Sequence, residues 1–164
     1  MTFTHIIVGA GAAGCVLAEG LSRRPEHRVL LIEAGPDYPD LTTLPPDLVD
    51  GTVPSLASHD WGIHARGPLA RSMHLPRGKV VGGSSQTNSC IALRPEREDL
   101  DPLNGLDHPD WCWQRMLRCL VEIERDGDFS GPYHGASGPL PLRRPTDALT
   151  EISQRFLKAA NALG

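Results

Sequence analysis

Cysteine is scarce in this chain, and its four residues form no CxxC pair. Two of them stand seven residues apart, which is about two helical turns and places both on one helix face. This sparse, unpaired spacing does not suggest a disulfide framework. We therefore expect reduced, partly buried thiols in a cytoplasmic protein, at positions Cys15, Cys90, Cys112 and Cys119.

Lysine is scarcer still, because 14 of the 16 basic residues are arginine. The arginines are scattered along the chain, and the net charge is -4. A nucleic-acid-binding surface would show a clustered basic excess, so the composition argues against that class of protein.

Several other signals are missing. No stretch approaches the roughly twenty apolar residues that a membrane span needs. The apolar start lacks a basic region, is interrupted by glycines and is closed by Glu19, so we expect no secretory signal. The seven histidines show no HExxH spacing, so no metal site is predicted. Neither a Gly-x-Ser-x-Gly elbow nor a P-loop lysine pattern occurs, which leaves hydrolase and NTPase functions unsupported.

The most informative stretch that is present is HIIVGAGAAGCVLAEGLSRRPEHRVLLIEAGPD, residues 5–37 of a chain about one domain long. The apolar run from His5 to Val8 predicts a buried parallel strand. A Gly-x-Gly-x-x-Gly motif follows, and apolar residues then recur at helical spacing as far as Leu21. A second predicted strand, Val29 to Ile32, ends at Glu33.

Each part of this unit suits a dinucleotide. Gly9 permits a tight turn, Gly11 lets the backbone approach a pyrophosphate, and Gly14 lets the helix pack closely on the strand. The helix amino terminus presents free N–H groups and a positive dipole end to phosphates, beside Ala12 and Ala13. Glu33 can accept hydrogen bonds from a ribose, and its charge disfavours the 2′-phosphate of NADP. The motif alone leaves FAD and NAD both open.

Further motifs follow in order: EAGPD (33–37), DWGI (60–63), LPRGKVVGGSS (75–85), NSCIA (88–92) and REDLD (97–101). Together they resemble the glucose–methanol–choline (GMC) oxidoreductases, a family of FAD-dependent alcohol oxidases and dehydrogenases. The likeness is closest to the choline oxidase branch and extends through YHGASGPL (133–140) and FLKAANALG (156–164). The first signature of the family is met by Gly82, Gly83, Ser84, Ser85, Asn88, Ala92, Pro95 and Asp101.

The resemblance implies that the glycine-rich stretch VVGGSSQTNSCIAL (80–93) lies along a flavin and its pyrophosphate. Glycines without a Cβ allow the close approach that this needs. The choline oxidase branch has a histidine that holds FAD covalently where this chain has Thr87, so we expect non-covalent FAD. The implied cofactor-binding residues are Gly9, Gly11, Ala12, Ala13, Gly14, Glu33, Ala34, Trp61, Gly78, Gly82, Gly83, Ser84, Ser85, Thr87, Asn88, Ser89, Cys90 and Ile91.

The rest of the chain gives coarser signals. Residues 36–76 are rich in Pro, Asp and Gly and predict a long irregular excursion, which can cover the cofactor. Residues 111–125 predict a helix with a core-facing stripe, residues 138–145 a short strand, and the chain ends in an amphipathic helix. The stripe consists of Trp113, Met116, Leu117, Leu120 and Ile123, and the apolar face of the last helix of Leu149, Ile152, Phe156, Leu157 and Ala160.

The predicted fold class is therefore α/β. We expect an incomplete Rossmann-type FAD-binding domain with a flavin loop over residues 1–110, and the helix, strand and helix that start an α+β substrate domain over residues 111–164. The family's fold implies further strands and a carboxy-terminal part or second chain that completes the sheet. The sequence leaves three possibilities open: a fragment of a longer enzyme, a split enzyme or a truncated product.

The family chemistry is hydride transfer from an alcohol carbon to flavin, assisted by a histidine paired with a histidine or asparagine. The resemblance places those residues outside this chain, so no catalytic residue is predicted within it. The leading hypothesis is the FAD-binding portion of an alcohol oxidoreductase that needs the remaining part for activity. The alternative is a non-catalytic subunit that binds flavin or a partner chain. The sequence does not identify the alcohol or the electron acceptor.

Overall fold

The computed structural model describes residues 2–104 and 109–163. Its contacts divide the chain into two compact units, Met1–Ile91 and Ala92–Gly164. The sequence analysis placed the boundary between the two domains after residue 110, on the basis of motifs. That boundary remains a prediction.

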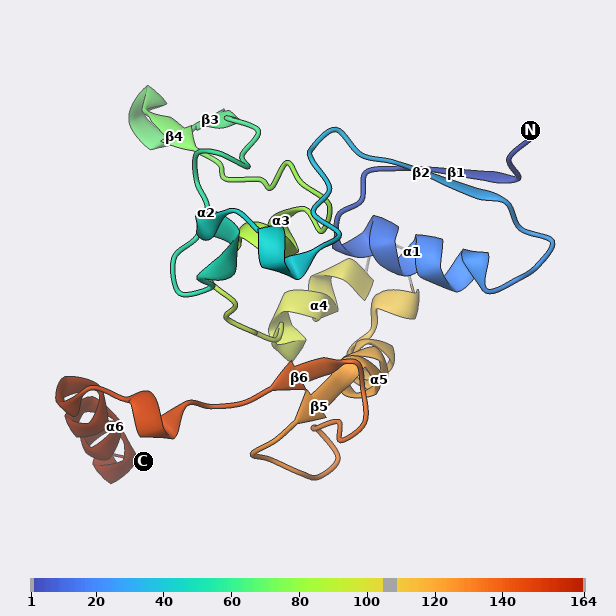
Figure 1. The fold of residues 1–164 in the computed structure, drawn as a ribbon. Helices are drawn as coiled ribbons and strands as arrows, with labels where there is room; N and C mark the ends of the chain where they lie inside the picture. The colour runs from blue at the N-terminus through green and yellow to red at the C-terminus, as the bar shows by residue number, and fades with distance from the viewer. Residues whose placement is uncertain (1, 105–108, 164) are drawn as a thin grey trace. The chain divides into compact units, whose positions relative to one another are not determined.

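The first unit is built on the β–α–β arrangement that the sequence predicts. Strands β1 (His5–Val8) and β2 (Val29–Ile32) are parallel, with His5 opposite Val29 and Val8 opposite Ile32. Helix α1 (Ala12–Ser22) connects them and packs against both strands (Figure 1). The predicted strand, helix and strand are therefore confirmed at their expected positions.

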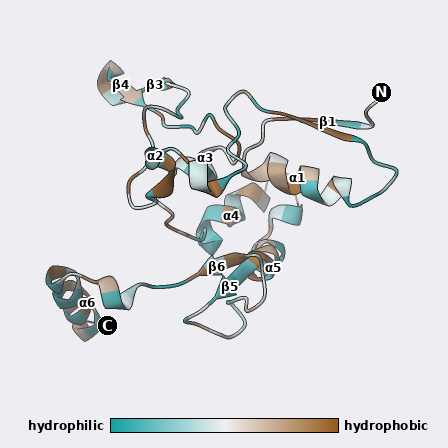
Figure 2. Cartoon of the chain, in the orientation of Figure 1, coloured by the Kyte–Doolittle hydropathy of each residue, from teal (hydrophilic) through white to brown (hydrophobic). Residues whose placement is uncertain are grey.

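One face of this strand pair differs from the prediction of a buried strand. Ile7 is half-buried and lies beside Gly14 of α1, whereas Ile6 and Val8 are 62% and 83% exposed. Figure 2 shows these strands in brown, as strongly apolar segments. The prediction was wrong for this face, because among the described residues α1 covers the other side of the pair only.

Residues 36–76 form the irregular excursion that the composition indicates. Strands β3 (His64–Arg66) and β4 (Ser72–His74) make a small antiparallel hairpin, and the helical pieces are single turns. These turns are η1 (Leu41–Thr43), α2 (Pro46–Val49) and η2 (Pro68–Ala70).

The predicted flavin loop contains one element that the sequence did not indicate, the short helix α3 (Ser84–Thr87). It begins directly after Gly83, whose φ is +58°. A single turn of polar residues has no apolar periodicity, so pattern analysis cannot detect it.

The second unit combines short helices with a parallel pair of strands, β5 (Glu124–Asp126) and β6 (Leu140–Leu142). In α5 (Trp113–Ile123) four predicted core residues are half-buried, but Ile123 is 47% exposed. None of the helices within the described ranges is long and apolar enough to cross a membrane. The remaining elements are α4 (Arg97–Asn104), η3 (Pro109–Trp111), η4 (Thr146–Ala148) and α6 (Glu151–Leu163).

The turn between β1 and α1 is packed at backbone level on two sides. A Cβ on Gly14 would collide with the carbonyl of Gly9, so the helix can approach the strand only without a side chain there. From the other side, a Cβ on Gly83 would lie 2.8 Å from the Cα of Gly11. Gly83 also combines positive φ with a ψ of -140°, a conformation that is nearly restricted to glycine. These contacts hold the predicted flavin loop (residues 80–93) directly on the turn.

We expect Gly83→Ala to destabilise the first unit by roughly 2 kcal/mol or more, because the substitution adds backbone strain to a steric clash. Gly20→Ala is the matched control, since a Cβ at Gly20 meets nothing within 4 Å. Within a helix that control is expected to be stabilising by about 0.5–1 kcal/mol. Urea denaturation of both variants measures the difference, and equal midpoints would show that the close approach is not required.

Candidate functional site: a glycine-lined anion cradle

The amino terminus of α1 has the properties of an anion site. Its N-cap is Gly11, no side chain caps the helix, and no acidic residue lies in the first turn. Ala12 and Ala13, the first helical residues, are exposed. No side chain occupies the first N–H groups, and the positive end of the helix dipole suits a phosphate.

The predicted flavin loop lies against this helix terminus. The N–H of Gly82 donates to the carbonyl of Ala10 at 2.7 Å, and Gly11 and Gly82 form a parallel bridge. Ala10 is fully buried at this junction. The structure thus brings together the two glycine motifs, which are about seventy residues apart in the sequence. We call the terminus of α1 at Gly11, Ala12 and Ala13, with Gly82 and Gly83 beside it, the anion cradle.

The polar side chains of the loop hydrogen-bond within the loop. Ser84 Oγ accepts from the N–H of Gly78 at 3.0 Å, and Ser85 Oγ donates to the carbonyl of Gly82 at 2.6 Å. Asn88 Oδ1 accepts from the N–H of Cys90 at 2.7 Å, next to a Cys90 φ of +53°. A hydroxyl both donates and accepts, so each serine keeps capacity for a ligand while it shapes the loop.

Glu33 fixes the turn from the end of β2, a role that the sequence analysis missed. Its Oε2 accepts from the N–H of Ala10 at 2.7 Å, and its Oε1 accepts from the N–H of Gly35 at 2.9 Å. These bonds, the one from Gly35 foremost, lower the pKa of the Glu33 carboxyl below its ordinary value. Each oxygen retains a lone pair, so the predicted contact with a ribose hydroxyl remains compatible with this geometry.

The remaining predicted site residues lie along the same loop or beside it. Trp61 is 49% exposed, and Lys79 Nζ lies 5.0 Å from the centre of its ring. The N–H of Trp61 donates to the carbonyl of Arg77 at 3.0 Å, close to Gly78. Thr87 is buried, Ser89 is half-buried, and Ala34 and Ile91 are exposed.

The sequence analysis also missed a partly buried polar network in the first unit. It consists of Tyr38, Asp47, Ser55 and His59, and we call it the His59 network. These four residues belong to the irregular excursion, where no periodicity or motif places them together. The residue types alone, an aspartate and a histidine close to DWGI, were the one available signal.

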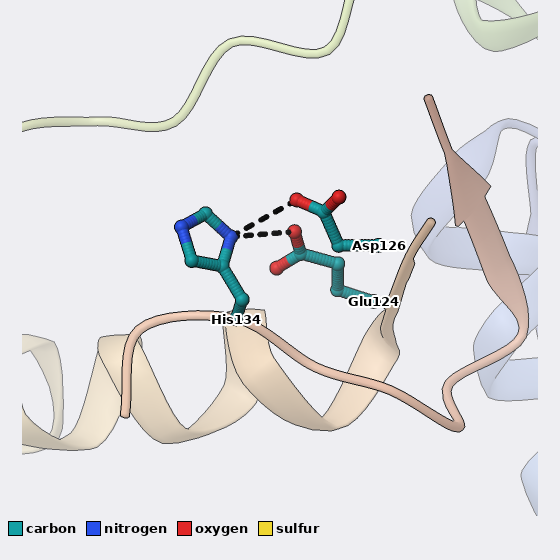
Figure 3. A group of neighbouring side chains, drawn as sticks. All are labelled: Glu124, Asp126 and His134. Carbon is teal, nitrogen blue, oxygen red and sulfur yellow. Dashed lines mark hydrogen bonds and ion pairs between the residues drawn. The ribbon is translucent and has the colours of Figure 1, made fainter. Parts of the chain in front are cut away.

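The second unit contains a cluster of Glu124, Asp126 and His134, whose residue types could hold a metal ion (Figure 3). His134 Nδ1 lies 3.3 Å from Glu124 Oε1 and 3.0 Å from Asp126 Oδ2. However, Arg94 pairs with Glu124, and Arg144 pairs with Asp126 at 2.9 Å. The arginines neutralise both buried carboxylates, so this arrangement is a buried ionic network rather than a set of available metal ligands.

The surroundings of Asp126 also affect its pKa. Hydrogen bonds from Arg144 above all hold the pKa of Asp126 well below its ordinary value. The N–H groups of Asp128 and Phe129 also donate to Asp126, which fixes the turn after β5.

Residues 3–164 match the family model described as GMC oxidoreductase. The 5-(hydroxymethyl)furfural oxidase of Methylovorus sp. (strain MP688) is 37% identical over 87% of this chain and 29% of its own length. The mitochondrial choline dehydrogenase of Mus musculus is 33% identical over 99% of the chain and 28% of its own length. The chain therefore spans less than a third of each of these relatives.

Solved structures agree with this match. Pyridoxine 4-oxidase from Mesorbium loti superposes with a TM-score of 0.85 at 30% identity, covering 99% of this chain and 32% of its own. An FAD-dependent oxidoreductase from Chaetomium thermophilum gives a TM-score of 0.80 at 28% identity, covering 99% and 30%. The prediction of a partial Rossmann-type α/β fold is confirmed by these neighbours.

We expect Glu33→Gln to destabilise the first unit by about 1–3 kcal/mol at neutral pH, because one of two N–H groups loses its acceptor. The pKa of Glu33 is lowered on folding, so its contribution is present above the ordinary value of 4.5 and is lost as the pH falls through the folded value. Urea denaturation at pH 7 and at about pH 3 should therefore show a difference that shrinks in acid. A matched control is Glu26→Gln at an exposed site, and a difference independent of pH would contradict this role.

We expect Asp126→Asn to lower the urea midpoint of the second unit more than Asp110→Asn does. Both aspartates pair with an arginine, but the side chain of Asp126 is fully buried whereas that of Asp110 is 72% exposed. Removing the charge at the buried site leaves Arg144 without its principal partner, whereas exposed pairs contribute little. Tryptophan fluorescence during unfolding measures both variants, and equal effects would refute the importance of the buried network.

Proposed function

Because this chain belongs to the GMC oxidoreductases, we propose that it is the FAD-binding amino-terminal portion of an oxidoreductase that acts on CH–OH donors. One observation carries the proposal above all others: the uncapped terminus of α1 opens beside the two glycines of the loop. Such a surface accepts a phosphate without steric or electrostatic penalty.

The residues of the cradle divide the work of binding. Backbone N–H groups at Gly11, Ala12 and Ala13 would hold the pyrophosphate, and Glu33 would accept a hydrogen bond from the ribose. Residues 82–91 and Trp61 would contact the isoalloxazine. Thr87 offers no nucleophilic ring nitrogen, so the cofactor is bound non-covalently. Bound FAD supplies the acceptor for a hydride from an alcohol carbon, and the histidine pair that assists lies outside these residues.

The names of three similar proteins suggest the class of substrate. They specify 5-(hydroxymethyl)furfural, choline and pyridoxine, each of which bears a primary alcohol. We therefore propose a primary alcohol as the donor.

We also propose the cytoplasm as the compartment, because four free cysteines suit its reducing environment.

The exposed apolar face of the strand pair supports a need for additional protein. Ile6, Val8 and Ile32 are 62%, 83% and 46% exposed, although parallel sheets are normally covered on both faces. We propose that further chain, covalently continuous or supplied as a second polypeptide, covers this face and provides the catalytic residues. Activity is then expected only when that part is present.

The test of cofactor binding uses Gly11→Val. A Cβ at Gly11 meets nothing within 4 Å and the φ is -74°, so we expect the fold to accept a side chain that would occupy the space proposed for the pyrophosphate. We expect FAD retention to fall at least about tenfold, while the free energy of unfolding measured in urea changes by no more than about 1 kcal/mol. Native mass spectrometry and the visible spectrum measure the flavin and reveal any second polypeptide.

Gly20→Val, at an open position on α1, is the matched control and should retain FAD like the unaltered chain. Equal retention by the Gly11 and Gly20 variants would contradict the assignment of the cradle. Failure of the unaltered chain to take up FAD, alone or with its completing part, would overturn the proposed function.

A further inference from the structure

The His59 network joins two buried polar side chains of the first unit to the half-buried Tyr38 and Asp47. His59 and Ser55 are each only 6% exposed. His59 Nδ1 lies 2.8 Å from Asp47 Oδ2, and its Nε2 lies 3.0 Å from the hydroxyl of Tyr38. Ser55 Oγ donates to the same Asp47 oxygen at 2.6 Å. A histidine held on both ring nitrogens can adopt only one orientation.

The direction of these hydrogen bonds follows from the carboxylate. An ionised aspartate only accepts, so Nδ1 of His59 carries the proton that faces Asp47. The Ser55 and His59 bonds together keep the pKa of Asp47 below its ordinary value. In the neutral imidazole, Nε2 is then an acceptor, and the Tyr38 hydroxyl donates to it. Every member of the network has a hydrogen-bond partner. The loss of the Tyr38 hydroxyl or of the Asp47 carboxylate would therefore leave a nitrogen of the buried His59 ring without one.

The backbone of the same segment is bonded to both ends of the flavin loop. The carbonyl of His59 accepts from the N–H of Lys79 at 2.7 Å, and residues Asp60 and Gly78 form an antiparallel bridge. At the other end, the N–H of Ser55 donates to the carbonyl of Thr87 at 3.0 Å. The network therefore fixes two backbone anchors, one before Gly82 and one at the end of α3.

Tyr38 extends the connection to the cradle. It follows β2 and Glu33 in the chain, and it lines a cavity of about 230 Å³ together with Cys15, Gly82 and Gln86. The edge of the Tyr38 ring meets the His59 ring at an interplanar angle of 77°. One side chain thus contacts both the network and the space beside the loop glycines.

We infer that His59 is a positioning residue for the flavin loop: through Asp47, Ser55 and Tyr38 it sets the conformation of residues 78–91 against the terminus of α1. This inference rests on the proposed function for the identity of the ligand. The loop itself needs such support, because two adjacent glycines and a strained Cys90 give it little conformational preference of its own.

Tyr38→Phe is the sharpest test, because it removes one hydroxyl and keeps the ring. Asp47→Asn is the second variant, and Tyr133→Phe, at an exposed tyrosine of the second unit, is the matched control. Hydrogen exchange of the chain without added cofactor should show roughly tenfold faster exchange in residues 78–91 for both network variants, and no change in residues 113–123. In the FAD-loaded protein, Tyr38→Phe should raise the Kd for FAD roughly tenfold and alter the flavin spectrum at saturation.

The outcomes separate this inference from the proposed function. Unchanged exchange in residues 78–91, or equal acceleration in both units, overturns the role of the network in the loop. Faster local exchange with an unchanged flavin spectrum and Kd overturns positioning of the cofactor. Absence of FAD from every form of the protein defeats the proposed function, and the exchange experiment then still decides whether the network sets the loop.

Discussion

The first unit depends on a contact between two stretches of backbone, in which the loop glycines lie on the turn between β1 and α1. A methyl group on Gly83 would lie 2.8 Å from the Cα of Gly11, so the loop can approach the turn this closely only with glycine at position 83. The hydrogen bond from Gly82 to the carbonyl of Ala10 holds this approach in register. The same absence of side chains that allows the contact leaves the helix terminus open, so packing and the capacity to bind an anion have one cause.

Polar side chains that are buried or half-buried support this contact through two sets of hydrogen bonds. The carboxylate of Glu33 accepts hydrogen bonds from the N–H groups of Ala10, in the turn, and of Gly35, after β2. The His59 network bonds the excursion to the start and the end of the loop. Apolar burial in this unit is limited, so directional hydrogen bonds rather than a large core determine where the loop lies. A site of this kind is specific in shape but sensitive to the loss of single partners.

The second unit uses charge in a comparable way for a different purpose. Glu124 and Asp126 are buried on β5, and each is matched by an arginine from a distant segment, Arg94 or Arg144. His134 lies between the two carboxylates and joins the pairs. Such a network ties the turn of the YHG motif to the strand pair, which accounts for that motif without any ligand. The apolar faces of β1 and of α6 are exposed in the described residues.

The sequence by itself determined the local framework. Residue periodicity and glycine spacing fixed β1, α1, β2 and α5 within a residue or two, because strand and helix preferences act over a few neighbouring positions. Order and spacing of motifs likewise predicted the family, and the resemblance implied that the glycine-rich stretch lies along a flavin and its pyrophosphate. Only the tertiary structure decided that Glu33 closes the turn, that Tyr38, Asp47, Ser55 and His59 meet, and that Ile6 and Val8 stay exposed. These features arise from contacts between segments distant in sequence, or from the lack of a covering layer, and no local pattern encodes either.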